Sequence, residues 1–255
     1  MVARSLTLNA LAGLPMIKPG DDLAALLIES MRRMQIVPQD KDVIIVAQKV
    51  VSKAEGRFVD LKTVLPSSRA TAVAGEVNKD ARLVEVILSE AAEIIRQKRD
   101  VLIVAHRLGF IMANAGVDQS NVAGEDDDKA LLLPRDPDAS AAALKARLDR
   151  EFGVDLAVII NDSFGRPWRF GVVGVALGAA GLPVLRDMVG VPDLFGRKMR
   201  VTEIAIADEI AGAASLLMGQ GAEGIPAVHL HGFTWTEAPA PAAALLRPKE
   251  EDLFR

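Results

Sequence analysis

The sequence predicts an α+β fold in which helices pack on a mixed sheet. Two kinds of segment indicate this: short apolar runs typical of buried strands, and longer stretches whose apolar residues recur every three or four positions, as in amphipathic helices. Polar turns that contain glycine follow most of the strand-like runs. At 255 residues the chain is long enough for two small domains. We therefore expect the elements to be divided between two subdomains.

The first half of the chain contains four expected elements. The aspartate pair at 21–22 can cap a helix that ends near residue 34, because leucines and methionines follow it at helical spacing. Residues 42–47, DVIIVA, are predicted to form a short buried strand. A second amphipathic helix is expected at 81–97 and a second strand at 101–105.

The second half repeats the alternation. An amphipathic helix is expected at 139–152, followed by a buried strand at 156–160. Thr202 can cap a third long helix at 203–218, whose apolar residues share one face. Residues 227–230 complete the pattern as a final strand.

Two segments rich in small residues or proline fit neither pattern. The Gly- and Ala-rich segment 171–181 is ambiguous between a strand and a helix. Residues 238–244 are typical of a Pro/Ala linker and lead into a short charged piece. We therefore assign residues 1–233 to the main folded region, with two interleaved subdomains, and residues 234–255 to a linker and a tail that packs on it.

The residue counts exclude several kinds of chemistry. The chain has no cysteine, which excludes a thiol nucleophile, disulfides, iron–sulfur clusters and cysteine zinc sites, and it has no tyrosine to act as a phenol acid. Its three histidines are His106, His229 and His231, and a surface or core role fits them better than a metal site. Carboxylates, amides, hydroxyls and Lys/Arg side chains remain for catalysis.

The net charge of −4 is concentrated in one segment. Seven acidic and two basic residues lie between positions 118 and 138, so the rest of the chain sums to +1. This distribution gives no basic face for nucleic acid. No run approaches the roughly 18 apolar residues of a membrane span. We expect a cytoplasmic protein, and we interpret the aspartates at 126–128 as a solvated loop, with an acidic lid near a metal as the alternative.

Polar residues cluster at 114–121, directly after the strand-like segment 110–113. Asp118 offers oxygen atoms to a hard cation, and Asn121 offers both a donor and an acceptor. A turn held by local Asn and Asp hydrogen bonds is the alternative, and taken alone it is favoured.

A second cluster, 161–169, follows the predicted strand at 156–160. Asp162 and the hydroxyl of Ser163 can share a divalent cation, while Arg166 and Arg169 can clamp a phosphate or a carboxylate. The structural alternative has an arginine stacked on Trp168 and Asp162 capping a turn. So many functional groups within ten residues favour a functional site.

Lys49 and Lys53 follow the strand at 42–47 and are four residues apart, so in a helix they would share a face. Like charges at this spacing repel each other unless an anion lies between them. A solvated lysine pair is the strong alternative.

The segment 219–224 matches GxGxxG, but a helix precedes it and Ile225-Pro226 follows. A dinucleotide fingerprint requires a strand, then the glycines, then a helix, so we reject that interpretation. A backbone wrapped around a ligand and a helix end capped by Gly219 remain open.

Taken together, these motifs resemble the coenzyme F-420-0:γ-glutamyl ligase family. The resemblance extends in order from residue 14 to residue 231, continues in the tail at 247–255, and includes two long specific blocks, ANAGVDQSN and NDSFGRPWR. It rests on five blocks: 14–17, 48–57, 113–121, 161–169 and 218–220.

The resemblance implies a ligase that uses GTP and adds L-glutamate through a γ-linkage to a deazaflavin coenzyme precursor. It further implies a probable acyl-phosphate intermediate, release of GDP and phosphate, Mg²⁺ or Mn²⁺ with K⁺ as a further cation, and an intertwined homodimer. Residues 1–233 would then be the catalytic region.

The resemblance also assigns site residues by position. Asp118, Asp162, Ser163 and Gln220 would bind metal, and Arg166 and Arg169 are candidates for the catalytic chemistry. The GTP site would contain Leu14, Pro15, Met16, Ile17, Gln48, Lys49, Lys53, Asn121, Met218, Gly219, Gln220, Gly221, Ala222, Glu223, Gly224 and Ile225.

Two other functions remain as alternatives. A paralogous nucleotide-dependent amide ligase would keep the site and act on another small carboxylate. A non-catalytic dimeric protein would use residues 164–169 to hold an anionic metabolite, without consuming GTP.

Overall fold

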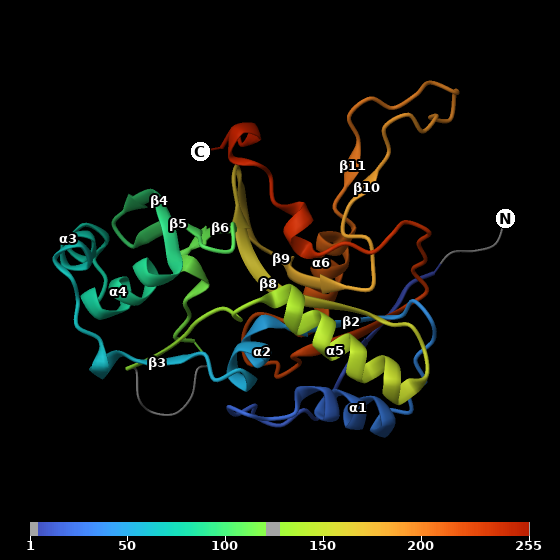
Figure 1. Cartoon of the computed structure of the whole chain (residues 1–255), viewed down its shortest axis with the longest axis horizontal. Coiled ribbons are helices and arrows are strands. Elements are labelled where there is room, and N and C mark those ends of the chain that lie inside the picture. The colour runs from blue at the N-terminus through green and yellow to red at the C-terminus, as the bar shows by residue number, and fades with distance from the viewer. Residues whose placement is uncertain (1–4, 121–127, 255) are drawn as a thin grey trace.

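The structure is a computed structural model that describes residues 5–120 and 128–254. Its centre is a five-stranded sheet with the order β1-β12-β2-β8-β9 (Figure 1). Strands β2 and β8 are parallel, and the other neighbours are antiparallel, so the predicted mixed sheet is confirmed. The strands are β1 (Thr7–Ala10), β12 (Ala227–His231), β2 (Val43–Ala47), β8 (Ala157–Arg166) and β9 (Arg169–Ala180).

Helices cover both faces of this sheet. Helix α6 (Ile206–Met218) packs on one face with Val43 and Ile45, while α1 (Leu23–Arg33) and α5 (Pro137–Phe152) pack on the other. Successive strand residues point to opposite faces, so β2 is buried on both sides. This is why its sequence is apolar throughout instead of alternating.

Strand β9 explains the ambiguous segment 171–181. A Cβ at Gly174 would lie 2.3 Å from the Ala211 carbonyl oxygen of α6, and a Cβ at Gly178 would lie 2.2 Å from the Pro137 carbonyl oxygen of α5. Helices therefore approach this strand on both faces to a distance that only glycine permits. The small residues of this segment are there because the helices pack so closely on it. They give the sequence no period of two from which a strand could be predicted.

A second group of elements has its own hydrophobic cluster, shown at the left of Figure 1. Helices α3 (Ser68–Val77) and α4 (Ala81–Glu90) pack beside a sheet of order β4-β5-β6. The division of residues 1–233 into two interleaved subdomains, and the boundary at 233 between this region and the tail, stay predictions. The sheet strands are β4 (Ala91–Lys98), β5 (Val101–His106) and β6 (Ile111–Ala113), and β3 (Phe58–Asp60) pairs separately with β7 (Lys129–Leu131).

The helix expected at 81–97 is wrong in its second half. The helix ends at Glu90, and Ala91–Lys98 forms strand β4 against β5. This pairing contains two register shifts, between Ala91 and Glu93 and between Ile94 and Arg96. Such bulges interrupt the period of two, and the apolar residues are left at a spacing that resembles a helix.

The helix expected at 203–218 begins later than predicted. Glu203–Ile204 is strand β11, which pairs with β10 (Arg186–Asp187) at the base of a projecting hairpin (Figure 1). The carbonyl of Thr202 accepts a hydrogen bond from the Met188 N–H within this hairpin. Thr202 therefore belongs to the hairpin, and the N-cap of α6 is Ala205.

The remaining elements are short. Helix α2 (Gln48–Ala54) follows β2 directly, and 3₁₀ helices occur at Leu61–Thr63, Asn114–Gly116, Ala242–Leu245 and Lys249–Glu251. The expected N-cap role of Asp22 is confirmed, because its carboxylate accepts the N–H of Ala25. Within the described ranges, no helix combines the length and the apolar character needed to cross a membrane.

Candidate functional site

Four chain segments meet at one edge of the central sheet. Strands β1, β2 and β8 run in the same direction, so their carboxyl ends lie at the edge where the antiparallel strand β12 begins. Two backbone bonds join these ends: Ala47 N–H to the Pro226 carbonyl, at 2.9 Å or less, and Leu11 N–H to the Ala227 carbonyl, at 2.9 Å. The carboxyl ends of parallel strands are where α/β proteins place ligand groups.

The segments at this edge carry the predicted motifs. The loop after β1 contains 14–17, helix α2 after β2 contains the two lysines, β8 itself continues through 161–163, and residues 219–226 lead into β12. The topology thus brings together motifs that are more than 200 residues apart in the sequence.

Lys49 and Asp118 form the central ion pair of the site. The Lys49 Nζ lies 2.6 Å from Oδ2 of Asp118 and donates to the Ser120 hydroxyl at 3.0 Å. Ser120 in turn donates its N–H to Oδ1 of Asp118 at 2.7 Å. The local Asp turn expected as the alternative is therefore present, and the same carboxylate also binds Lys49.

A strained turn positions Asp118. Asn114 and Ala115 both have a φ of 53°, and Gly116 has a φ of 66°, so three successive residues are left-handed. Non-glycine residues in this region cost roughly 1–3 kcal/mol each and persist only where the surrounding structure holds them. Here Ala115 is fully buried, and the Asp118 backbone exchanges two hydrogen bonds with Leu131.

Asp162 lies in β8, where its carboxylate accepts the N–H of Ser163 at 2.8 Å. Burial raises the pKa of Asp162 to about 6, the charge of Lys49 opposes this, and the charge of Asp118 adds to it. Asp118 has the opposite balance: burial raises its pKa, but the bonds from Lys49 and Ser120 outweigh burial and leave that pKa below its ordinary value. The two carboxylates therefore share one electrostatic environment, with Lys49 as the common cation.

Helix α2 buries its other polar residues. Lys53 is only 7% exposed, and burial together with the charge of Lys49 lowers its pKa. The Ser52 hydroxyl donates to the buried Gln48 side chain at 2.9 Å. The alternative of a solvated lysine pair is therefore wrong.

The glycine-rich segment after α6 is held by contacts between its own residues. Gly219 ends the helix, with its N–H bonded to the Ser215 carbonyl, so its predicted role as a helix cap is confirmed. The Glu223 carboxylate accepts the Gly221 N–H at 2.8 Å and lies against Gly219, where a Cβ would collide with it. Met218 is near β8, because its sulfur accepts from Asn161 at 3.3 Å.

A cavity of about 1030 Å³ opens beside the ion pair. Its walls are the β4-β5-β6 sheet, the ribbon formed by β8 and β9, and the C-terminal segment. It contains the predicted residues Gln48, Lys49, Asp118, Asp162, Ser163, Arg166 and Arg169.

Other predicted residues lie at the sheet edge and do not line this cavity. Met16 is 73% exposed, whereas Ile17 is buried in the core beside α1. Asn121 and the aspartates at 126 and 127 lie outside the described residues. Lys53, Leu14–Ile17 and the loop 218–225, which includes Gln220, are likewise absent from the lining.

Sequence reasoning did not identify four residues of the site. Ser120, the partner of Lys49, lies two positions after Asp118 in the motif and could have been found there. Arg96, Arg247 and Phe254 line the cavity, but they come from a bulged strand and from the C-terminal segment. No spacing in the sequence relates them to the other site residues.

The donor set fits a hard divalent cation. Asp118 and Asp162 offer carboxylate oxygens and Ser163 offers a hydroxyl, and Mg²⁺ typically uses one or two carboxylates together with substrate phosphates. In the part of the chain that is described, no group of three or more His, Cys, Asp or Glu side chains could hold a metal ion alone.

Comparisons with known proteins agree with this arrangement. The sequence profile of the family described as "F420-0:Gamma-glutamyl ligase" matches residues 13–232. The chain is 45% identical to the "Coenzyme F420:L-glutamate ligase" of Methanothermobacter thermautotrophicus over 252 residues, which cover 98% of this chain and 99% of that protein. It is 46% identical to the protein of the same name from Methanopyrus kandleri, over 94% of this chain and 93% of the relative. The polar cluster at the sheet edge, the order of the motifs and these full-length matches together show that the chain belongs to the F420-0:γ-glutamyl ligase family.

Proposed function

We propose that this chain is a GTP- and divalent-metal-dependent ligase that joins L-glutamate, through its γ-linkage, to the deazaflavin coenzyme F420-0. The observation that carries the proposal is the cavity beside Asp118, Lys49 and Asp162, where two carboxylates and a lysine converge at the edge of the sheet. The names of the relatives supply the two substrates that are joined.

The proposed reaction has two steps. The acceptor carboxylate attacks the γ-phosphate of GTP, forming an acyl phosphate and releasing GDP. The glutamate amine then attacks the acyl carbon, and the C–O bond to phosphate breaks, so that an amide and inorganic phosphate are produced. Phosphoryl transfer of this kind depends on positioning and charge neutralisation more than on a protein nucleophile, which suits a chain without cysteine.

The residues of the site have complementary roles in this reaction. Asp118, Asp162, Ser163 and Gln220 would hold Mg²⁺ or Mn²⁺, with K⁺ as a further cation, and such cations stabilise charge on the transferring phosphate. Lys49 holds Asp118 in place and supplies a positive charge next to both carboxylates. The loops 14–17 and 218–225 lie at the same sheet edge and would enclose the nucleotide.

Mass spectrometry of the product tests the function. The protein is incubated with coenzyme F420-0, GTP, Mn²⁺ and L-glutamate, and the expected product is heavier by one glutamyl residue. Reactions that lack GTP, contain EDTA or replace GTP with ATP establish the nucleotide and the metal. An acceptor screen that detects GDP release identifies any other carboxylate substrate. No mass shift with any nucleotide or metal would overturn the proposal.

Two substitutions test the metal-binding assignment. Asp118→Asn and Asp162→Asn should each reduce turnover at least 100-fold with the fold retained in circular dichroism. Asp100→Asn, in the turn between β4 and β5, is the matched control and should keep full activity. Near-normal activity of both site variants would contradict the assignment.

We also propose that the active form is a homodimer. The hairpin between β10 and β11 exposes Leu194 at 99% and Phe195 at 83%, and large exposed apolar side chains are typical of interaction surfaces. Sedimentation velocity at micromolar concentration should give a species of twice the 27.2 kDa chain mass. A single species of one chain mass would contradict a dimer.

A further inference from the structure

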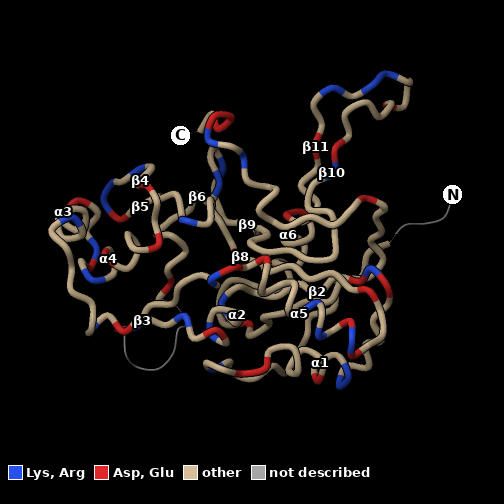
Figure 2. The backbone as a smooth tube through the Cα atoms, in the orientation of Figure 1, with Lys and Arg blue, Asp and Glu red and all other residues tan. Residues whose placement is uncertain are grey.

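The part of the cavity farthest from the carboxylates is strongly basic. Four arginines line it: Arg96 from β4, Arg166 and Arg169 from the tip of the β8–β9 ribbon, and Arg247 from the C-terminal segment. Figure 2 shows basic stretches of the backbone where this ribbon tip meets the C-terminal segment. Three separate parts of the chain therefore place positive charge around one volume.

None of these arginines forms an ion pair with a carboxylate among the described residues. Arg96 donates to the carbonyl of its own neighbour Ile95 at 2.7 Å, and Arg166 donates to the Gly171 carbonyl at 3.2 Å. The Arg247 guanidinium lies 6.0 Å from the centre of the Phe254 ring. Asp252 of the C-terminal segment also lines the cavity, so the four arginines outnumber the acidic side chains at this end. Guanidinium groups bind carboxylates and phosphates with bidentate hydrogen bonds. The cluster thus has the composition of an anion site.

Aromatic rings lie beside these arginines. Phe170 is fully exposed at the ribbon tip and lines the cavity. Phe254 also lines it, and its ring packs at 6.3 Å against Trp168, which is itself 87% exposed. Exposed aromatic faces next to arginines provide a surface on which a flat ring system can stack.

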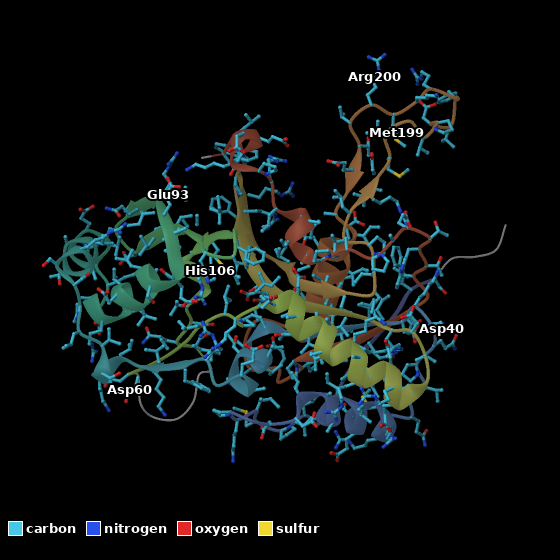
Figure 3. The ribbon with its side chains drawn as sticks, viewed as in Figure 1. Asp40, Asp60, Glu93, His106, Met199 and Arg200 are labelled. Carbon is cyan, nitrogen blue, oxygen red and sulfur yellow. The ribbon has the colours of Figure 1, made fainter. Side chains whose placement is uncertain are left out.

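The C-terminal segment forms one wall of this cavity and is held in place by contacts with the rest of the chain. Lys249 forms an ion pair of 3.0 Å with Glu93 of β4, which is labelled in Figure 3. A Cβ at Gly109 would lie 2.7 Å from the Leu246 side chain, so the segment packs closely on the loop before β6. Upstream, Asp138 of α5 accepts the N–H of Ala242 at 2.7 Å. Bonds to three different elements therefore fix the segment beside the ribbon tip.

The basic end is separate from the carboxylate end. Asp162 and Arg166 are four residues apart on β8, which corresponds to about 13 Å along an extended strand. A ligand that reaches from one end to the other must therefore be elongated. Its reacting group would lie near Asp162 and its anionic or aromatic part near Arg166.

We propose that Arg96, Arg247 and Phe254, together with Arg166 and Arg169, form the acceptor subsite of this cavity. The ligand is a planar aromatic molecule that carries a phosphate or carboxylate group. Phe254 stacks on the ring, and the arginines bind the anionic group. The identity of the acceptor rests on the proposed function, whereas the ligand class follows from the cavity itself.

Fluorescence titrations test the subsite without requiring turnover. The probes are coenzyme F420-0, FMN and riboflavin, of which the last two share a ring system and differ by a phosphate. The wild-type protein should bind FMN at least fivefold more tightly than riboflavin. Arg96→Gln and Arg247→Gln should each weaken F420-0 and FMN binding about tenfold, and Phe254→Ala should weaken all three probes.

The controls separate charge recognition from folding and from nucleotide binding. Arg99→Gln changes an exposed arginine that follows the same strand and pairs with Asp100, and it should bind every probe like the wild type. Arg96→Lys and Arg247→Lys should recover part of the affinity for FMN. The KM for GTP should stay within twofold in all of these variants. Unfolding midpoints show whether each variant is folded.

The outcomes distinguish this proposal from the proposed function. If the wild type binds F420-0 in an arginine-dependent way but forms no glutamyl product, the function fails and the subsite stands. If the wild type ligates but Arg96→Gln and Arg247→Gln change neither probe affinity nor the KM for the acceptor, the subsite fails. Equal binding of FMN and riboflavin by the wild type would also overturn it.

Discussion

Lys49 is the residue on which the electrostatics of the site depend. Its ammonium pairs with Asp118, and its charge opposes the rise in the Asp162 pKa caused by burial. The resemblance to the ligase family, and not the strand pattern, grouped both aspartates and this lysine in one candidate site. The sequence could not show that the lysine binds a carboxylate of the site, because that contact joins residues 69 positions apart.

Removing this charge should abolish catalysis while leaving the fold intact. Lys49→Met is expected to lower kcat at least 100-fold, because Asp118 then loses the ammonium group that holds its carboxylate in place. Lys79→Met, in the turn between α3 and α4, is the matched control. Steady-state kinetics with GTP and F420-0 make the comparison, and a kcat of Lys49→Met within threefold of the wild type would refute this role.

A second cluster of charged side chains lies where helix α4 and strand β5 end, and it stabilises the fold. Glu90 is buried and lies 3.1 Å from Arg57 and 3.0 Å from Arg107, with the His106 ring nitrogen at 3.5 Å. His106 accepts the Leu108 N–H through its Nδ1, so its proton is assigned to Nε2, which faces Glu90. Burial raises the pKa of Glu90, but the histidine and the two arginines outweigh it, and the pKa is lower in the folded protein than its ordinary value.

This shift predicts a dependence of stability on pH. A carboxylate whose pKa is depressed by folding contributes stability above its unfolded pKa, about 4.3, and loses it as the pH falls through the folded value. Glu90→Gln should lower the free energy of unfolding by about 3 kcal/mol at pH 7, because the arginines lose their partner. Urea titrations should show this difference shrinking as the pH falls below the unfolded pKa. Glu29→Gln, on the exposed face of α1, should change stability little at any pH.

At the scale of the elements, strands were predictable where burial alone determined their sequence. The run 42–47 in β2 is apolar because both faces are covered, and it was placed within one residue. Strand β4 was missed because its bulges imitate helical spacing, and β9 was missed because its glycines serve the helices on either side. In both strands the determining interaction comes from a distant part of the chain.

Strand β9 gives a direct test of this explanation. Gly174→Ala should lower the free energy of unfolding by about 3 kcal/mol, because its Cβ would overlap the backbone of α6 and force the helix away. Gly165→Ala in the paired strand is the control, since a Cβ there meets nothing within 4 Å, and it should cost under about 1 kcal/mol. Chemical denaturation measures both, and equal losses in the two variants would argue against close helix packing as the cause.

At the scale of the whole molecule, the candidate site is a product of topology. The predicted motifs were correct guides to the sheet edge, but the sequence did not reveal how the cavity is enclosed. Its far wall combines the β4-β5-β6 sheet with the C-terminal segment, and the residues that matter there, Arg96 and Arg247, belong to no motif. Charge that converges from separate segments becomes visible only when the chain is folded.

The pairing of β1 with β12 has a consequence for the order in which the protein assembles. These strands join Thr7 to His231, so one edge of the sheet stays open until almost the whole chain has left the ribosome. Contacts so distant in sequence are formed late, because a long loop must close before they are gained. Strand β12 also lies between β1 and β2. The loop that follows β1 and the helix that follows β2 can therefore come together only after β12 has paired with both strands. During synthesis, this edge of the sheet is therefore completed last, and an unfinished chain has no assembled candidate site.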